Sequence, residues 1–155
     1  MSVAVWRPYT QMKTEASALE VTGTEGCWIE LADGRRLLDG IASWWTACHG
    51  YNHPHIRARV EAQLHAFPHV MFGGLTHAPA EALAERLCAM LPADLDHVFF
   101  TESGSVSVEV ALKMALQSWQ NLGRPGKTGL VSFQSAYHGD TLATMALCDP
   151  REGMH

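Results

Sequence analysis

The chain has 155 residues, of which 47% are hydrophobic and 17% are charged, and its formal net charge is −5. A chain of this length can bury the core of one ordinary domain, and no apolar run approaches the length that crosses a membrane. No basic patch stands out against the negative charge, so the composition argues against nucleic acid as a partner.

The cysteines and the N-terminal residues indicate the compartment. The four cysteines are far apart and form no C-x-x-C pair, which favours reduced thiols over a disulfide framework. The first nine residues lack a basic region followed by an apolar run, the pattern of a secretory signal. We therefore expect a cytoplasmic protein.

The first third of the chain predicts a β-hairpin followed by a loop. Short β-like pieces at 27–31 and 36–39 flank Asp33-Gly34, a dipeptide typical of tight hairpin turns. A loop rich in tryptophan and histidine follows at 43–53.

Two helices are expected next, because apolar residues recur at helical spacing. The first covers 55–67, directly after Pro54, and proline is tolerated in a first helical turn. The second begins at Pro79 and ends before Pro92, which cannot continue a helix.

The last third predicts a strand–helix–strand unit. Apolar runs at 97–101 and 130–133 are the expected strands, and a helix from about 105 to 121 lies between them. A crossover of this length is typical of a parallel sheet in an α/β protein. A doubly wound sheet normally has about five or more strands, so we expect this chain to be the N-terminal part of a longer protein.

The turn Ser103-Gly104-Ser105 stands between the first expected strand and the helix. Free N–H groups at a helix N-terminus, together with the helix dipole, favour an anion such as phosphate. The turn matches neither a phosphate loop of the G-x-x-x-x-G-K-[ST] type nor the G-x-G-x-x-G of dinucleotide folds. A helix cap without a ligand is the alternative, since serine is among the preferred capping residues.

A second loop, around Tyr137, follows the second expected strand. Ligands of parallel sheets bind beyond the carboxyl ends of the strands, so this loop and the Ser-Gly-Ser turn are expected to face the same crevice. The ring of Tyr137 is suited to stack on a flat cofactor there. The alternative is a core aromatic followed by an ordinary turn at Gly139-Asp140.

Several motifs resemble the class III aminotransferases, which are pyridoxal-phosphate enzymes of fold type I, and the resemblance covers essentially the whole chain. They are Trp6-Arg-Pro-Tyr-Thr-Gln-Met12, Ser43-Trp-Trp-Thr-Ala-Cys-His-Gly-Tyr-Asn-His-Pro54, Ser103-Gly-Ser-Val-Ser-Val-Glu-Val-Ala-Leu-Lys113, Tyr137-His-Gly-Asp-Thr141 and Ala146-Leu-Cys-Asp-Pro150. The resemblance implies a partial α/β fold. Residues 1–45 would be the N-terminal part of a small domain with the hairpin, and 46–155 the first part of a large cofactor-binding domain with a parallel sheet.

The resemblance also implies roles for five residues. Gly104 and Ser105 would hold the phosphate of pyridoxal 5′-phosphate. Tyr137 would pack on the pyridine ring and line the substrate site. Trp44 would form a wall of the substrate pocket. Tyr9 would contact the substrate or help the site to distinguish its two amino-group partners.

Within the family, the segment 106–110 resembles the branch that acts in biotin synthesis. That branch implies transfer of an amino group from S-adenosylmethionine to 8-amino-7-oxononanoate, giving 7,8-diaminononanoate, and family members are homodimers. Two alternatives remain open: another class III transaminase that acts on ω-amino acids, and a non-catalytic module that binds a phosphate ligand.

The reaction needs a lysine that forms a Schiff base with the cofactor and an acidic partner for the ring nitrogen. Lys13, Lys113 and Lys127 are the lysines of this sequence, and none matches the family's lysine motif. In the family both groups, and the arginine for the substrate carboxylate, come later than residue 155. We therefore expect a fragment without a catalytic residue of its own, which is inactive alone.

The histidine-rich part of the loop raises the question of a metal. His49, His53 and His55, with Cys48 nearby, are residue types that bind zinc. Their spacing fits no closed structural site and Pro54 interrupts it, so turn and capping roles are favoured and no metal is expected.

Overall fold

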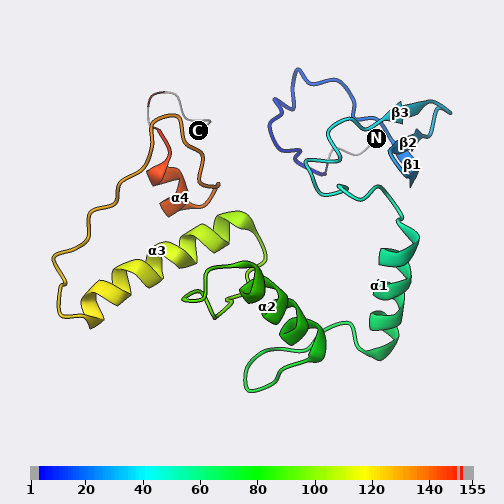
Figure 1. The fold of residues 1–155 in the computed structure, drawn as a ribbon. Helices are drawn as coiled ribbons and strands as arrows, with labels where there is room; N and C mark the ends of the chain where they lie inside the picture. Colours follow the sequence, from blue (N-terminus) through cyan, green and yellow to red (C-terminus); the bar gives the residue numbers. More distant parts are fainter. Residues whose placement is uncertain (1–3, 150, 152–155) are drawn as a thin grey trace. The chain divides into compact units, whose positions relative to one another are not determined.

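In a computed structural model that describes residues 4–149 and 151, the chain divides into two compact units, one ending at Leu75 and one beginning at Thr76 (Figure 1). The first unit holds three short strands and one helix, and the second holds three helices among its described residues. The boundary at 45/46, between a small-domain part and a large-domain part, comes from the family resemblance and not from compactness. It stays a prediction.

The sheet of the first unit is antiparallel, with strand order β1-β2-β3. The strands are β1 (Val21–Glu25), β2 (Trp28–Leu31) and β3 (Arg36–Leu38). The β2–β3 register pairs Trp28 with Leu38, which confirms the predicted hairpin. Its turn is closed by Asp33, whose carboxylate accepts a 3.0 Å hydrogen bond from the N–H of Arg35.

The loop after β3 returns to the sheet before the helix begins. Tyr51 forms an isolated antiparallel bridge with Gly26, with N–H···O distances of 3.1 and 2.7 Å. Helix α1 (Pro54–Ala66) then starts with proline in its first turn, where the missing N–H needs no partner. The predicted helix at 55–67 is confirmed to within one residue at each end.

The second unit carries α2 (Ala78–Met90), α3 (Gly104–Asn121) and α4 (Leu142–Leu147). The first two confirm the helices predicted from Pro79 and over 105–121. Helix α4 was not predicted. It packs against α3 and follows directly after the loop around Tyr137.

The two strands predicted at 97–101 and 130–133 are wrong for the described residues. Neither segment is a strand, and the three-stranded antiparallel sheet is the one sheet in the part of the chain that the structure describes. An apolar run indicates that burial of the segment is favourable, but a strand also needs a neighbouring strand with which its backbone forms hydrogen bonds. Val131 and Phe133 are 99% and 86% exposed here. The described residues thus form a mixed arrangement of helices with a small antiparallel sheet.

Apolar burial is sparse. Leu31, on β2, is the one buried hydrophobic side chain among the described residues, while many large apolar side chains are exposed. Polar groups are also buried: Thr144 is completely enclosed and Asp149 is 7% exposed. None of the helices in the described ranges has the length and apolar character to cross a bilayer.

Candidate functional site

The N-terminus of α3 has the features of an anion site. Ser103 is the N-cap, and its hydroxyl accepts a 3.2 Å hydrogen bond from the N–H of Val106. Within the described part of the chain, the N–H groups of Gly104 and Ser105 meet no hydrogen-bond acceptor. No acidic residue stands in the first turn. Two donors and the positive end of the helix dipole are therefore free for a negative group.

Two hydrogen bonds hold the loop around Tyr137 beside this turn. The N–H of Asp140 donates to Oγ of Ser105 over 2.9 Å. The hydroxyl of Thr141 donates to the carboxylate of Glu109 over 2.6 Å, one helical turn further along α3. The structure thus brings together the two segments that the sequence placed at one crevice, although not through a parallel sheet.

Gly139 makes this close approach possible. It is buried and has φ +130°, a conformation that residues with a side chain rarely adopt. A β-carbon at this position would lie 2.6 Å from Oγ and 2.8 Å from Cα of Ser105. The loop can reach the turn Ser103–Ser105 this closely only with glycine at this position.

The loop is also fixed at its start. Asp149 accepts hydrogen bonds from the N–H groups of Ser135 (2.9 Å) and Arg151 (2.8 Å). Ser135 has φ +55°, so this contact secures a left-handed residue two positions before Tyr137. The side chain of Tyr137 is half exposed, and Nε2 of the neighbouring His138 is buried with no partner among the described residues.

Four residues of this framework were missed by the sequence reasoning: Glu109, Thr141, Thr144 and Asp149. Thr141 carried a usable signal, because threonine directly before an apolar run is a typical helix N-cap. Its N–H donates to Oγ1 of Thr144 over 2.9 Å, and the Thr144 hydroxyl donates to the carbonyl of Thr141 over 2.8 Å. Asp149 carried no comparable signal, since its partner Ser135 is 14 residues away.

Tyr9 and Trp44 lie together in the first unit. Their ring centroids are 5.8 Å apart and the rings are tilted by 40°, within the range of favourable aromatic pairs. Both side chains are exposed. Two of the three residues proposed to line the substrate pocket therefore form one aromatic surface in the first unit. The third, Tyr137, belongs to the second unit together with Gly104 and Ser105, the other residues proposed to hold the cofactor.

Trp44 stands in an unusual turn. Four consecutive residues with side chains have positive φ: Ala42 (49°), Ser43 (44°), Trp44 (58°) and Trp45 (67°). Such residues normally visit this region singly. The run was not predicted, because no glycine inside it indicates a left-handed conformation.

The carboxylate of Asp39 organises this turn. Its Oδ1 accepts from the N–H of Ile41 (3.2 Å), and its Oδ2 accepts from the N–H of Ser43 (2.7 Å) and the hydroxyl of Tyr51 (2.5 Å). The Tyr51 bond is the main reason that the pKa of Asp39 is lowered, and the same bond raises the pKa of Tyr51. The Ser43 hydroxyl contacts both groups.

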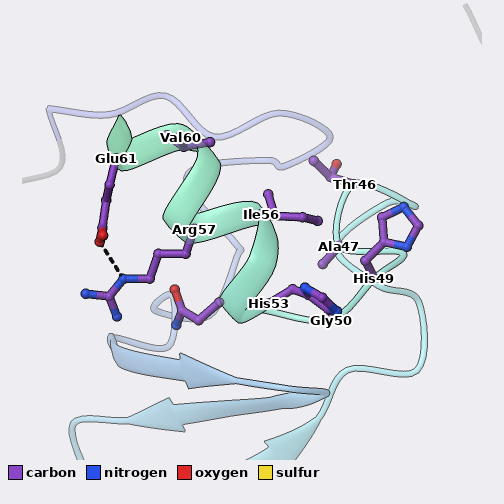
Figure 2. Close-up of a pocket in the computed structure, with 10 residues that line it drawn as sticks. Thr46, Ala47, His49, Gly50, His53, Ile56, Arg57, Val60 and Glu61 are labelled. Carbon is purple, nitrogen blue, oxygen red and sulfur yellow. Dashed lines mark hydrogen bonds and ion pairs between the residues drawn. The ribbon is translucent and has the colours of Figure 1, made fainter. Parts of the chain in front are cut away.

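A groove of about 340 Å³ lies between the loop at 46–53 and α1 (Figure 2). His49 and His53 line it, and Arg57 at its edge is paired with Glu61 over 2.8 Å. The described residues contain no group of three or more His, Cys, Asp or Glu side chains placed to hold a metal ion. The histidines of this loop therefore do not form a metal cluster in the described ranges.

Comparison with known proteins gives a consistent result. The family model described as aminotransferase class-III matches residues 9–155. The adenosylmethionine-8-amino-7-oxononanoate aminotransferase of Corynebacterium glutamicum is 46% identical over 151 residues, which are 97% of this chain and 35% of the relative. The protein of the same name from Mycobacterium leprae is 46% identical over 157 residues, 97% of this chain and 36% of the relative. The chain thus spans about a third of the length of the curated relatives that it matches.

Solved structures share the fold. The adenosylmethionine-8-amino-7-oxononanoate aminotransferase of Methanocaldococcus jannaschii superposes with a TM-score of 0.88 at 33% identity, over 94% of this chain and 34% of that one. An amine transaminase from an uncultivated Pseudomonas species, in its PLP-bound form, superposes with a TM-score of 0.84 at 31% identity, over 96% and 34%. The described chain therefore has the structure of about one third of a transaminase of this kind.

Proposed function

This chain belongs to the class III aminotransferases, and from that membership we propose that the whole protein performs the amino-group transfer of biotin synthesis. The donor is S-adenosylmethionine, the acceptor is 8-amino-7-oxononanoate and the product is 7,8-diaminononanoate. Support comes from the 46% identity to relatives from C. glutamicum and M. leprae that are named for this reaction. The segment 106–110, which resembles the biotin branch, agrees with it.

The observation that carries the proposal is the hydrogen bond between Asp140 and Ser105. It keeps the loop around Tyr137 beside a helix N-terminus with two free N–H groups, and this arrangement fits a cofactor with a phosphate handle and a flat ring. Pyridoxal 5′-phosphate supplies an aldehyde that takes up the amino group and a ring that withdraws electrons.

The residues of this chain bind and orient. The N–H groups of Gly104 and Ser105 would donate to the phosphate, where the helix dipole favours negative charge. The ring of Tyr137 would pack on the pyridine ring and line the substrate site. Trp44 and Tyr9 form an apolar wall that excludes water from the bound substrate.

The reactive lysine is proposed to lie outside residues 1–155. Lys113 is the lysine of α3, nine residues after Gly104, so it stands about 13 Å further along the helix axis. Lys127 packs on the ring of Trp119, with Nζ 3.9 Å from the ring centroid. Neither belongs to the group around Ser105, so we expect the 155-residue chain alone not to turn over.

The test is a substrate screen on the whole protein loaded with pyridoxal phosphate. We expect 7,8-diaminononanoate, detected by mass spectrometry, when S-adenosylmethionine and 8-amino-7-oxononanoate are supplied together. The alternative is a transaminase for ω-amino acids. The similarity of the fold to an amine transaminase and an omega-transaminase gives it some support. Turnover of ω-amino acids without turnover of S-adenosylmethionine would reject the biotin reaction in favour of that alternative.

We also propose that the whole protein is a cytoplasmic homodimer. The free state of all four cysteines supports a reducing compartment. The many exposed apolar side chains need cover, which the rest of the whole protein or a second subunit would supply. Sedimentation of the whole protein at the monomer mass would reject the dimer.

A further inference from the structure

We infer that Asp39, with Tyr51 as its partner, is a positioning residue that holds the turn Ala42–Trp45 in its left-handed conformation and so places Trp44 in the substrate pocket. The inference rests on the proposed role of Trp44 as a wall of that pocket. It assigns a specific task to two residues that do not themselves touch the substrate.

The turn needs an external support. In a left-handed conformation the β-carbon of an L-residue crowds the following carbonyl oxygen, so a run of four such residues is unfavourable by itself. Three backbone hydrogen bonds cross the run: from Trp45 N–H to the carbonyl of Ile41 (3.1 Å), from Thr46 N–H to that of Ser43 (3.3 Å) and from Ala47 N–H to that of Ala42 (2.9 Å). Right-handed turns can form hydrogen bonds of the same spacing, so these bonds do not favour the left-handed conformation.

Asp39 supplies contacts from outside the run, and those to Ser43 reach a residue inside it. Its two oxygens accept from the N–H groups of Ile41 and Ser43 and from the hydroxyl of Ser43 (3.1 Å). These donors converge on one carboxylate because the chain coils tightly around it. Hydrogen bonds to an ionised acceptor are stronger than neutral ones, so the carboxylate can offset the strain of the turn.

Tyr51 ties this carboxylate to the sheet. Its hydroxyl donates to Oδ2 of Asp39, and its backbone pairs with Gly26 on both sides of the bridge. The next residue, Asn52, donates from Nδ2 to the carbonyl of Thr24 on β1 over 2.5 Å. The turn that carries Trp44 is therefore anchored to β1 and to the β1–β2 connection, and not only to its own loop.

The consequence reaches the pocket through Trp44 and Tyr9. A change of sign in φ at Trp44 would redirect its side chain. The 5.8 Å separation of the two ring centroids therefore depends on the left-handed conformation of the turn. Loss of Asp39 or Tyr51 should therefore disturb substrate binding and leave the phosphate turn at Ser105, in the other compact unit, unaffected.

The experiment compares four single variants of the whole, cofactor-loaded protein: Asp39→Ala, Tyr51→Phe, Trp44→Ala and the control Asp33→Asn. Asp33 is an exposed carboxylate in the hairpin turn of the same unit, paired with Arg35 and remote from the Trp44 turn in sequence. Three measurements are made: amide hydrogen exchange of a peptide covering 40–47, KM and kcat for both substrates, and the affinity for pyridoxal phosphate.

For Asp39→Ala and Tyr51→Phe we expect exchange over 40–47 to quicken roughly tenfold, as expected for loss of a hydrogen bond to a charged group. KM should rise with kcat and cofactor affinity little changed, and Asp33→Asn should behave as the parent. Unchanged exchange in Tyr51→Phe, the milder variant, overturns the inference even if Asp39→Ala does not fold.

A second substitution distinguishes loss of the turn conformation from a general loss of protein stability. Glycine adopts positive φ without strain, so Ala42→Gly in the Asp39→Ala background should restore much of the protection and lower KM again. Failure to restore either quantity rejects the mechanism. If Trp44→Ala leaves KM unchanged, the proposed role of Trp44 is rejected instead, and the exchange data still decide whether Asp39 holds the turn.

Discussion

Asp140 and Ser105 are 35 residues apart in the sequence, and a 2.9 Å hydrogen bond from the N–H of Asp140 to Oγ of Ser105 joins them. This bond places the hydroxyl of Ser105 in two roles. It accepts from the loop around Tyr137, and its own proton remains available for an anion at the helix N-terminus. Under the proposed role of Ser105, cofactor binding and loop placement would therefore be coupled at one side chain.

Ser105→Ala tests this coupling. The change leaves the N–H of Asp140 without its acceptor and removes a donor to the phosphate, and bonds to charged groups contribute about 1.5–3 kcal/mol. We expect the affinity of the whole protein for pyridoxal phosphate to fall about tenfold or more, measured by titration of the absorbance of the bound cofactor. Ser118→Ala, on the exposed part of the same helix, is the matched control. Equal affinities of the two variants would contradict the role of Ser105.

Gly139→Ala should weaken cofactor binding and lower the melting temperature, although it adds only one methyl group. The added β-carbon would stand 2.6 Å from Oγ of Ser105, and φ of +130° strains any residue with a side chain. Overpacking of this kind costs about 1–3 kcal/mol, so we expect weaker cofactor binding and a lower melting temperature. Gly126→Ala serves as the control, because a β-carbon there meets no atom within 4 Å. The close approach would be disproved by a Gly139→Ala protein that binds the cofactor like the parent.

Tyr9 and Trp44 should act on the substrate as a pair. A double-mutant cycle with Tyr9→Ala and Trp44→Ala measures their coupling in kcat/KM, and aromatic pairs of this geometry contribute about 0.5–1.5 kcal/mol. We expect each single change to raise KM and the double change to be less than additive. Strict additivity would show that the 5.8 Å contact has no part in substrate binding.

The Asp39–Tyr51 bond predicts that the turn loosens in acid. The Tyr51 hydroxyl lowers the pKa of Asp39, so the unfolded turn binds more protons than the folded one at acid pH. The stabilisation is complete above the ordinary range of aspartate and is lost as the pH falls through the lowered pKa. Tyr51→Phe removes the donor, so hydrogen exchange over 40–47, corrected for its intrinsic pH dependence, should show its acid transition at higher pH than in the parent.

The alkaline side follows from the same bond with the opposite sign. Asp39 raises the pKa of Tyr51, so this contribution is present below the ordinary range of tyrosine and is lost as the pH rises through the raised value. Absorbance titration of tyrosinate should show, in the parent, a transition at raised pKa that Tyr51→Phe lacks. The carboxylates of Asp33 and Asp96, whose pKa values are lowered by Arg35 and His97, should titrate alike in both proteins.

Local patterns predicted the helices and the hairpin well. Proline at the first turn of α1 and α2, and Asp33-Gly34 between the strands, are signals that act within a few residues, so they need no knowledge of the rest of the fold. The predicted strands at 97–101 and 130–133 failed because pairing depends on a neighbour that the apolar pattern does not identify.

The site was predicted only in part, because some of its contacts join residues that are far apart in the sequence. Ser103 as a cap followed from a local signal. The predicted proximity of the Tyr137 loop is confirmed, but its premise of two parallel strands is wrong, since neither segment is a strand in the described residues. The left-handed turn at Ala42–Trp45 was not predicted, because its support comes from Asp39 and Tyr51, twelve residues apart. Asp39-Gly40 was a partial signal, since aspartate often binds the backbone two residues later and here accepts from Ile41.

The two compact units divide the proposed duties unequally. Gly104, Ser105 and Tyr137 lie in the second, whereas Tyr9, Trp44 and the Asp39 network lie in the first. Under the proposed roles, substitutions of Tyr9, Trp44 or the Asp39 network would act on substrate recognition and not on the phosphate of the cofactor, whereas Tyr137 would serve both. Members of the family accept different amino compounds, and substitutions in this first segment are one way in which that preference could diverge. Directed evolution for new amino donors would best begin there.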